Sequence, residues 1–395
     1  MIAPHRRRLV ALVVLTAAIA VGCAPVPGPA PTHTPLLGSA ALEPVTADAG
    51  ATYPSQVARA SSITYVRTGN PNGNATVPAA AAEENVSDPT HVIGTGTPGS
   101  CTSAALASAV RGGGIITFNC GPSPVTIELA STLTTCNTHN CKHPWQGGNI
   151  NNKLVVDGGG LVTLSGKGTH GIFYANACQE SFGWLTSTCN TETRPLVVFQ
   201  NITLENGNAT TSPSGLETLR GGGAIAMRGG QFKAVNVTFR NNVCMTRDSD
   251  GGGGAVRLTH QTATSYIVNS TLEGNSCANG GAVSGLHASI HIINSMLTGN
   301  TATGSGANSG QGGNGGAIYG DGNTFHFTID GTEISGNVAP EGGPGIFYVS
   351  NNRTGTLTIR DSAIINNTGE RFHTAPYRDL FYLGKSLSVT NSTVE

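Results

Sequence analysis

The sequence predicts an all-β fold: a right-handed, single-stranded parallel β-helix (a solenoid) over residues 91–395, with a short capping helix at its N-terminal end. Three observations lead to this prediction: two short motifs that alternate along the chain, the spacing of their copies, and an unusual composition. Charged residues make up 11% of the chain, and 55 of its 395 residues are glycine. Ordinary domains contain about 25% charged residues and about 7% glycine. This composition, without a collagen period, is typical of short strands stacked through tight turns.

The two motifs alternate through the second half of the chain. The first is Gly-Gly-Ala followed by Ile or Val, at residues 222–225, 253–256, 280–283 and 315–318. The second is a short strand that ends in asparagine, at Asn242, Asn275, Asn300, Asn337 and Asn367. These asparagines are 33, 25, 37 and 30 residues apart, a length that suits one coil of three strands and three turns. Stacked coils bury one apolar column and let asparagine amides hydrogen-bond along the axis, which accounts for both repeats.

A short helix is expected at residues 102–110, before the first strands. Thr102 or Ser103 can cap its start, alanine and leucine follow, and three glycines after Arg111 end it. Short apolar strands are then expected at residues 115–118, 125–129, 154–156 and 162–164. The helix would cover the end of the solenoid, which otherwise exposes unpaired strand edges.

Residues 1–23 have the order of residues of a secretory signal peptide. Three arginines at positions 6–8 precede an apolar run that is too short for a membrane span, which takes about 20 residues. The run ends in Ala-Val-Gly-Cys, which resembles the lipobox of bacterial lipoproteins and implies a lipid on Cys23. We therefore expect export and attachment to the membrane of the bacterial cell envelope or surface; cleavage near Gly22 with secretion is the alternative. Residues 24–90, rich in Pro, Ala and Thr, are expected to form a flexible tether.

Eight further cysteines remain, and an even set in an exported chain predicts disulfides. Pairing of nearest neighbours would join Cys101 to Cys120, Cys136 to Cys141, Cys178 to Cys189 and Cys244 to Cys277. Each pair would close a short loop, which suits a solenoid of local contacts, but the sequence leaves other pairings open. Cys136 and Cys141, with His139 and His143, could instead bind zinc; an oxidising compartment favours the disulfide.

Parts of the chain resemble known β-helix families. The opening helix, the glycine turn and the segment Asp157-Gly158-Gly159-Gly160 resemble the start of pectate-lyase-like and polygalacturonase-like proteins. The alternation of Gly-Gly-Ala-Ile with Phe-x-x-Asn resembles the repeats of chlamydial polymorphic outer-membrane proteins, with residues 239–242 as the strict copy. The resemblance covers residues 100–395 and implies the right-handed β-helix fold, but such a fold carries many functions.

The side chains of the Gly-Gly-Ala strands divide into two alternating sets. The apolar set is expected to face the core: Ile225, Met227, Val256, Leu258, Val283 and Ile318. The other set is expected to face outward and to stack between coils: Arg228, Arg257, Thr259, Ser284, Tyr319 and Asp321. This outward stripe combines cations, hydroxyls, an aromatic ring and an acid, so we interpret it as a contact face for carbohydrate or protein. Insertions at residues 243–250 and 301–314 are expected to leave one edge of the coils as loops.

No complete catalytic signature is recognised. The motifs Asn-Thr-Asp, Asp-Asp, Gly-His-Gly and Arg-Ile-Lys of polygalacturonases are absent from the sequence. Asp248 and Asp250 could bind Ca²⁺, because hard cations take carboxylate oxygens, although two acids before a glycine run more often form a solvated loop. No other cofactor is expected.

These observations favour a binding protein. A net charge of −1 without a basic patch indicates that nucleic acid is not a partner. The leading hypothesis is an exported, monomeric, adhesin-like protein of the cell envelope or surface that binds a polysaccharide or a cell-surface protein. The alternative is a polysaccharide lyase or glycoside hydrolase of pectate-lyase-like fold acting on a uronic-acid polysaccharide. A purely structural stalk is the third hypothesis.

Overall fold

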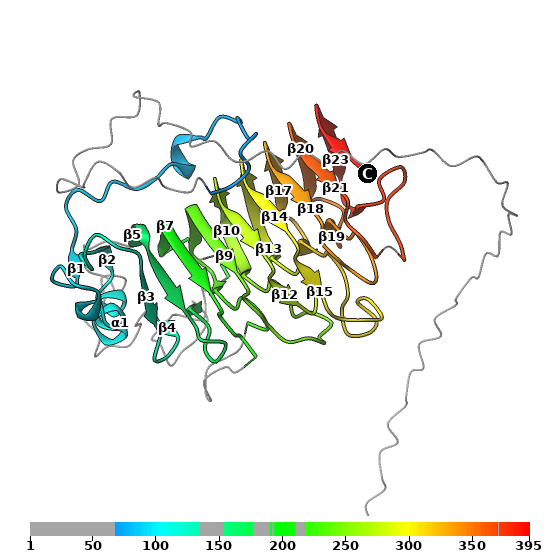
Figure 1. The fold of residues 1–395 in the computed structure, drawn as a ribbon. Coiled ribbons are helices and arrows are strands. Elements are labelled where there is room, and N and C mark those ends of the chain that lie inside the picture. Colours follow the sequence, from blue (N-terminus) through cyan, green and yellow to red (C-terminus); the bar gives the residue numbers. More distant parts are fainter. Residues whose placement is uncertain (1–67, 135–152, 177–189, 192, 211–218, 370) are drawn as a thin grey trace, which may run out of the picture. The chain divides into compact units, whose positions relative to one another are not determined.

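The computed structural model of the protein describes residues 68–134, 153–176, 190–191, 193–210, 219–369 and 371–395 (Figure 1). These residues belong to one compact unit of the chain. Their strands pair in parallel with strands one coil further along the sequence, so that coil stacks on coil. This stacking confirms the predicted parallel β-helix, whereas its right-handed sense stays a prediction. Within the described ranges, no helix has the length and apolar character needed to cross a membrane.

Each full coil passes through three parallel faces, which we name A, B and C in chain order. Face A contains β4 (Leu133–Thr134), β6 (Phe173–Asn176), β8 (Ile225–Arg228), β16 (Ile318–Gly322), β19 (Ile346–Ser350), β22 (Leu380–Leu383) and the first parts of β10 (Val256–Val268) and β13 (Val283–Ile293). Face B contains β1 (His91–Ile93), β2 (Gly114–Phe118), β17 (His326–Asp330), β20 (Thr356–Arg360), β23 (Ser386–Thr390), the second parts of β10 and β13, and the first parts of β5 (Lys153–Ser165), β7 (Leu196–Glu205) and β9 (Gln231–Arg240). Face C contains β3 (Val125–Glu128), β11 (Thr271–Glu273), β14 (Met296–Thr298), β18 (Glu333–Ser335), β21 (Ala363–Ile365), β24 (Thr393–Val394) and the second parts of β5, β7 and β9. The short strands β12 (Ser276–Cys277) and β15 (Thr301–Ala302) pair separately after face C.

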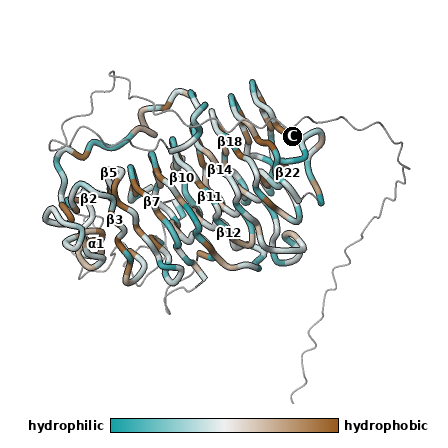
Figure 2. Tube along the Cα trace, in the orientation of Figure 1, coloured by the Kyte–Doolittle hydropathy of each residue, from teal (hydrophilic) through white to brown (hydrophobic). Residues whose placement is uncertain are grey.

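The interior of the coils is one continuous apolar core. The six residues predicted to face inward are all fully buried and belong to this core: Ile225, Met227, Val256, Leu258, Val283 and Ile318. Figure 2 shows hydrophobic residues recurring along the stacked strands. Burial of each such side chain contributes on the order of 2 kcal/mol, so the repeated apolar positions of the sequence hold the coils together.

A buried asparagine ladder lies where face C ends, and it confirms the role predicted for the repeated asparagines. The amide nitrogen Nδ2 of each member donates to Oδ1 of the next, at 3.0 Å for Asn242 to Asn275 and 2.9 Å for Asn275 to Asn300. The same pattern continues from Asn300 through Asn337 to Asn367. The ladder ends at Asp379, whose Oδ2 accepts from Nδ2 of Asn367 at 2.7 Å. The ladder satisfies backbone as well as side-chain groups, because the main-chain N–H of Asn275 also donates to Oδ1 of Asn300.

The predicted capping helix is α1 (Ser103–Gly112), which lies beside the first strands (Figure 1). Thr102 is its N-cap, and the hydroxyl of Thr102 accepts the N–H of Ala105 at 3.2 Å. Leu106 and Val110 are buried in the same core as the strands. The apolar face of the helix therefore continues the solenoid core at its N-terminal end. Two further short helices are 3-10 turns, η1 (Ala79–Ala81) and η2 (Pro98–Ser100).

Residues 68–90 correct the predicted boundary of the tether. The sequence placed them in a flexible segment, but they form an N-terminal strap that crosses the outside of face B against the chain direction of the coils. At one end, the hydroxyl of Thr68 donates to the carbonyl of Asn269 at 2.6 Å, and the side chain of Asn294 bonds the backbone of Ala75. At the other end, Glu84 forms ion pairs with Lys153 and Lys233. Residues 24–67 of the predicted tether lie outside the described residues.

The strap is held because it covers an apolar patch on the outside of face B. Ala81 is buried against Val235, Val268 and Ile293, and Val77 packs on the same cluster. Face B therefore has apolar residues on both sides of these coils, and the strap shields the outer ones from water. The sequence did not predict this packing of residues 68–90 on face B, because the few residues that anchor the strap are spread over a segment rich in alanine, threonine and polar residues.

Two of the four predicted disulfides are present in the described residues. Cys101 is bonded to Cys120 and Cys244 to Cys277, as nearest-neighbour pairing predicts. The second of these joins consecutive coils. The predicted lipidation site Cys23 and the other four predicted disulfide cysteines lie outside the described residues: Cys136, Cys141, Cys178 and Cys189.

Candidate functional site

The predicted outward stripe on face A points away from the core, but most of it is covered by loops. Parallel pairing aligns Arg257 with Ser284 and Ser284 with Tyr319. Their exposed fractions are only 2%, 0% and 1%, and Thr259 is 4% exposed. The expectation that this stripe is open to a ligand is therefore corrected for its central residues. Only Arg228 and Asp321, at the end of face A, are partly exposed.

Arg257 shows why the stripe is closed. Its guanidinium donates to the carbonyls of Leu219 and Asp250 and to the hydroxyl of Ser284. Burial lowers the pKa of Arg257, while Tyr319 and three nearby acids oppose that shift. The side chain thus fastens two loop segments over face A and cannot contact a ligand in bulk water. Sequence alone did not reveal this, because the covering backbone comes from insertions between the repeats.

Asp248 and Asp250 lie in one of these loops, and both form ion pairs with the guanidinium of Arg220. Nε of Arg220 is 2.9 Å from Oδ2 of Asp248, and Nη1 of Arg220 is 3.0 Å from Oδ2 of Asp250. Oδ1 of Asp248 also accepts the N–H groups of Asp250 and Gly251. Across the described ranges, no group of three or more His, Cys, Asp or Glu side chains is arranged to hold a metal ion. The loop is therefore stabilised by Arg220. The described residues add no third acidic, histidine or cysteine ligand to the predicted calcium site at Asp248 and Asp250.

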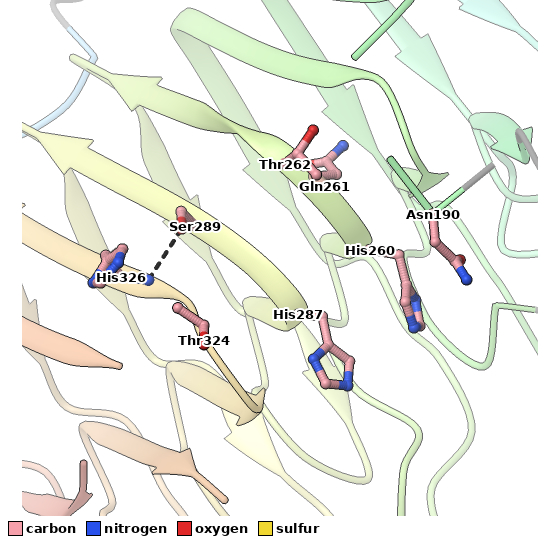
Figure 3. A pocket seen from close by; sticks show the side chains of 8 residues that line it. All are labelled: Asn190, His260, Gln261, Thr262, His287, Ser289, Thr324 and His326. Carbon is pink, nitrogen blue, oxygen red and sulfur yellow. Dashed lines mark hydrogen bonds between the residues drawn. The ribbon is translucent and has the colours of Figure 1, made fainter. Parts of the chain in front are cut away.

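A pocket of about 460 Å³ lies at the corner between faces A and B. We call it the histidine pocket and define it by its eight lining residues: Asn190, His260, Gln261, Thr262, His287, Ser289, Thr324 and His326. The lining comes from three consecutive coils, with Asn190 added from a loop (Figure 3). Every lining side chain carries a hydrogen-bonding group, and among the described residues none that lines the pocket is a carboxylate or an aliphatic side chain.

The coil stacking places His260 and His287 side by side (Figure 3). Thr259 pairs with Leu286 and Gln261 with Ala288, so the two histidines occupy the same position in consecutive coils. Both have positive φ, 50° and 52°, which turns the chain from face A to face B. Their ring centroids are 5.0 Å apart, close to the rise of one coil.

The third coil has glycine at this corner, which leaves room for the ring of His287. Gly322 has φ of 141°, and a Cβ atom there would lie 2.8 Å from Nδ1 of His287. The next residue, Asn323, donates its main-chain N–H to Nδ1 of His287 at 3.1 Å. This bond orients the imidazole and leaves its Nε2 to carry the proton in the neutral form.

Hydroxyls and amides continue the lining onto face B. The main-chain N–H of His326 donates to the hydroxyl of Ser289 at 3.0 Å (Figure 3). Nδ1 of His326 lies 2.9 Å from the hydroxyl of Thr356. Thr262, Thr324 and His326 are exposed. Hydrogen-bonding groups are thus presented at coil spacing along the axis of the β-helix.

His260 is the most perturbed group of the pocket. Burial, the positive charge of Arg228 and the proximity of His287 and Arg257 together lower the pKa of His260 to about 4, and burial is the largest of these causes. Nδ1 of His260 is buried and has no hydrogen-bond partner among the described residues. The imidazole is therefore neutral at physiological pH.

His260 is expected to titrate with a midpoint of about 4 rather than 6.5. The folded protein then binds this proton less readily than the unfolded chain, so the free energy of unfolding should fall as pH drops from 6.5 toward 4. NMR titration of the imidazole C–H signals, assigned with His260→Gln, measures the midpoint. In the His260→Gln variant, the free energy of unfolding should lose the part of its pH dependence that comes from His260. A midpoint above 6 would contradict the burial of the ring.

The sequence analysis missed all eight lining residues. A signal was nevertheless present, because His260 and His287 both stand four residues after the valine of a Gly-Gly-Ala-Val motif. Alignment of the repeats by that motif would have stacked them. Asn190 had no such signal, since it comes from an irregular connection.

Comparisons with protein-family models, curated proteins and solved structures found no match to this chain. The chemistry of the histidine pocket therefore has to be inferred from its own residues.

Proposed function

We propose that this protein is an exported, surface-located β-helix protein that binds a polysaccharide in the histidine pocket. One observation carries the proposal: the pocket crosses three coils, and all of the described residues that line it have imidazole, amide or hydroxyl side chains. Sugars present hydroxyls that both donate and accept hydrogen bonds, and these three side-chain types do the same. The absence of aliphatic lining side chains among the described residues disfavours an apolar ligand.

The spacing of the coils suits an extended polymer. Parallel coils repeat at about 4.8 Å, and one sugar ring advances an extended polysaccharide by a similar length. A chain lying along the axis would therefore meet an equivalent set of groups at each ring. His260, His287 and the turn at Asn323 stand at one corner position in three consecutive coils and form one row of groups along the axis. Ser289 and His326 form a second row beside it on face B.

Export with attachment through Cys23 completes the proposal. The signal-like residues 1–23 support it, as do the two disulfides, since such bonds persist in oxidising compartments. Incorporation of a labelled lipid precursor in the bacterial cell, tested beside Cys23→Ser, measures the attachment. A label retained in Cys23→Ser would reject lipidation at this residue.

The binding test compares two triple variants on a glycan array at about pH 7.5. Thr262→Ala, Thr324→Ala and His326→Ala together remove exposed donors and acceptors from the pocket, and we expect affinity to fall about tenfold or more, or roughly one hydrogen bond's net contribution. Thr368→Ala, Thr390→Ala and His373→Ala form the control, since these exposed residues lie outside the pocket.

Three results would count against the proposal. These are a wild-type protein that binds no glycan, a pocket variant that binds as well as wild type, and a control variant that loses binding equally. Release of unsaturated or reducing ends during the same incubation would instead favour the lyase or hydrolase alternative. A cleft with two close carboxylates, or a carboxylate cluster beside Arg257, would favour that alternative; Arg257 is 2% exposed, and none of the described residues that line the histidine pocket is a carboxylate.

A further inference from the structure

The charged and titratable groups around the histidine pocket are nearly all of one kind. His260 on β10, His287 on β13 and His326 on β17 line it. Arg228 on β8 is next to it, because its Nη2 donates to Oδ1 of the lining residue Asn190 at 3.1 Å. Each of these side chains either carries a positive charge or gains one as the pH falls.

The nearest acid on the adjoining strand is already engaged. Asp321, next to Gly322 on β16, accepts the Tyr319 hydroxyl at 3.0 Å through Oδ2. Its Oδ1 accepts the N–H of Gly322 at 2.6 Å and Nδ2 of Asn351 at 2.9 Å. Arg257, on β10 below the corner, is the remaining charge close enough to act on His260. The oxygens of Asp321 are thus directed toward Tyr319, Gly322 and Asn351, and none of the described residues that line the pocket is a carboxylate.

Protonation in this pocket is costly without a counter-charge. His260 and His287 have ring centroids 5.0 Å apart, and two like charges at such a distance repel strongly near a protein surface. An anion bound at the edges of both rings would reduce that repulsion. Anion binding and proton uptake at these two residues must therefore favour each other.

We propose that the histidine pocket binds an anionic group of a glycan, a sulfate or a carboxylate, and that this binding strengthens as the pH falls. The inference rests on the proposed polysaccharide-binding function and adds the charge of the ligand and its control by pH. At neutral pH the imidazole of His260 is neutral, and the pocket accepts a neutral glycan. As the pH falls, an acidic glycan is bound together with protons taken up by the imidazoles, and the pocket comes to select it.

The experiment uses dextran and dextran sulfate, two polymers that differ in charge, titrated calorimetrically into the protein at about pH 7.5 and about pH 5 at constant ionic strength. Dextran sulfate is expected to bind about tenfold more tightly at the lower pH, with net proton uptake measured in two buffers of different ionisation enthalpy. Dextran should show no such gain. His260→Gln with His287→Gln should abolish the gain, whereas His170→Gln with His373→Gln, outside the pocket, should keep it.

Inorganic sulfate separates this inference from the polysaccharide function. Sulfate should shift the imidazole NMR signals of His260 and His287 at about pH 5 but not at about pH 7.5, even if no glycan binds. Equal binding of either polymer at both pH values would overturn the anion proposal and leave the polysaccharide proposal standing. Sulfate shifts without glycan binding would support the anion site and reject the polysaccharide function. A gain that persists in the His260 and His287 variant would show nonspecific attraction and overturn the site.

Discussion

Asn300→Ala is expected to lower the free energy of unfolding by about 4 kcal/mol, because it breaks the asparagine ladder in its middle. Nδ2 of Asn300 donates to Oδ1 of Asn337 and to the carbonyl of Leu272. Oδ1 of Asn300 accepts both the main-chain N–H and Nδ2 of Asn275. All of these groups are buried, and each buried group left without a partner costs about 1–3 kcal/mol. Urea unfolding followed by circular dichroism measures the change.

The control for this prediction is Asn72→Ala, an exposed asparagine of the strap, which should change stability by less than about 0.5 kcal/mol. Asn300→Asp gives a second comparison. A carboxylate keeps the acceptor side but presents an oxygen to Oδ1 of Asn337, so this variant should also be destabilised, and more so above the pKa of the new acid. A loss below about 1 kcal/mol in Asn300→Ala would show that the ladder is not a main source of stability.

Lys233→Met is expected to release the N-terminal strap and to lower the free energy of unfolding by about 3 kcal/mol. The side chain of Lys233 is 2% exposed, and its Nζ donates to the carbonyl of Ala82 at 2.6 Å and pairs with Glu84. Methionine retains the length of the chain but leaves the carbonyl of Ala82 and the partly buried carboxylate of Glu84 without this partner. Removal of one partner of a buried ion pair costs about 3–5 kcal/mol in other proteins. Limited proteolysis should then cut within residues 68–90, and urea unfolding reports the energy.

Lys153→Met is the matched control, since Lys153 pairs with the same Glu84 but its side chain is 40% exposed. Its loss should cost less than about 1 kcal/mol, because water screens an exposed ion pair. Burial by itself would raise the pKa of Glu84, but hydrogen bonds and charges from Lys153 and Lys233 outweigh it and hold the pKa below its ordinary value. The strap contact should therefore weaken in acid, as Glu84 is protonated. Equal effects of the two lysine variants would contradict a special role for the buried one.

The repeat pattern predicted the fold, and the structure shows why. Gly-Gly-Ala-Val and the terminal asparagines recur because one apolar column and one amide ladder must be continued by every coil. Each coil contacts mainly its neighbours, so positions equivalent in sequence become neighbours in space. The disulfides Cys101–Cys120 and Cys244–Cys277 were predicted for the same reason, because contacts in a solenoid join residues that are close in the sequence.

The candidate site was predictable only in part. Alternation along a strand correctly divided the residues of face A into inner and outer sets, but outward orientation is not exposure. Arg257 and Tyr319 point away from the core and are nonetheless buried under loops. The length of an insertion reveals that a loop exists, whereas the face that it covers depends on contacts with residues far along the chain.

The sequence by itself determined the parallel coil, the core residues, the asparagine ladder and the capping helix, because these depend on short-range periodicity. The tertiary structure alone decided where the surface is open. In the tertiary structure, residues 68–90 lie over face B, and the segments at Leu219 and Asp250 cover face A. The corner at His260 and His287 stays accessible. These outcomes depend on which irregular segments find buried partners, and irregular segments have no period from which their contacts can be read.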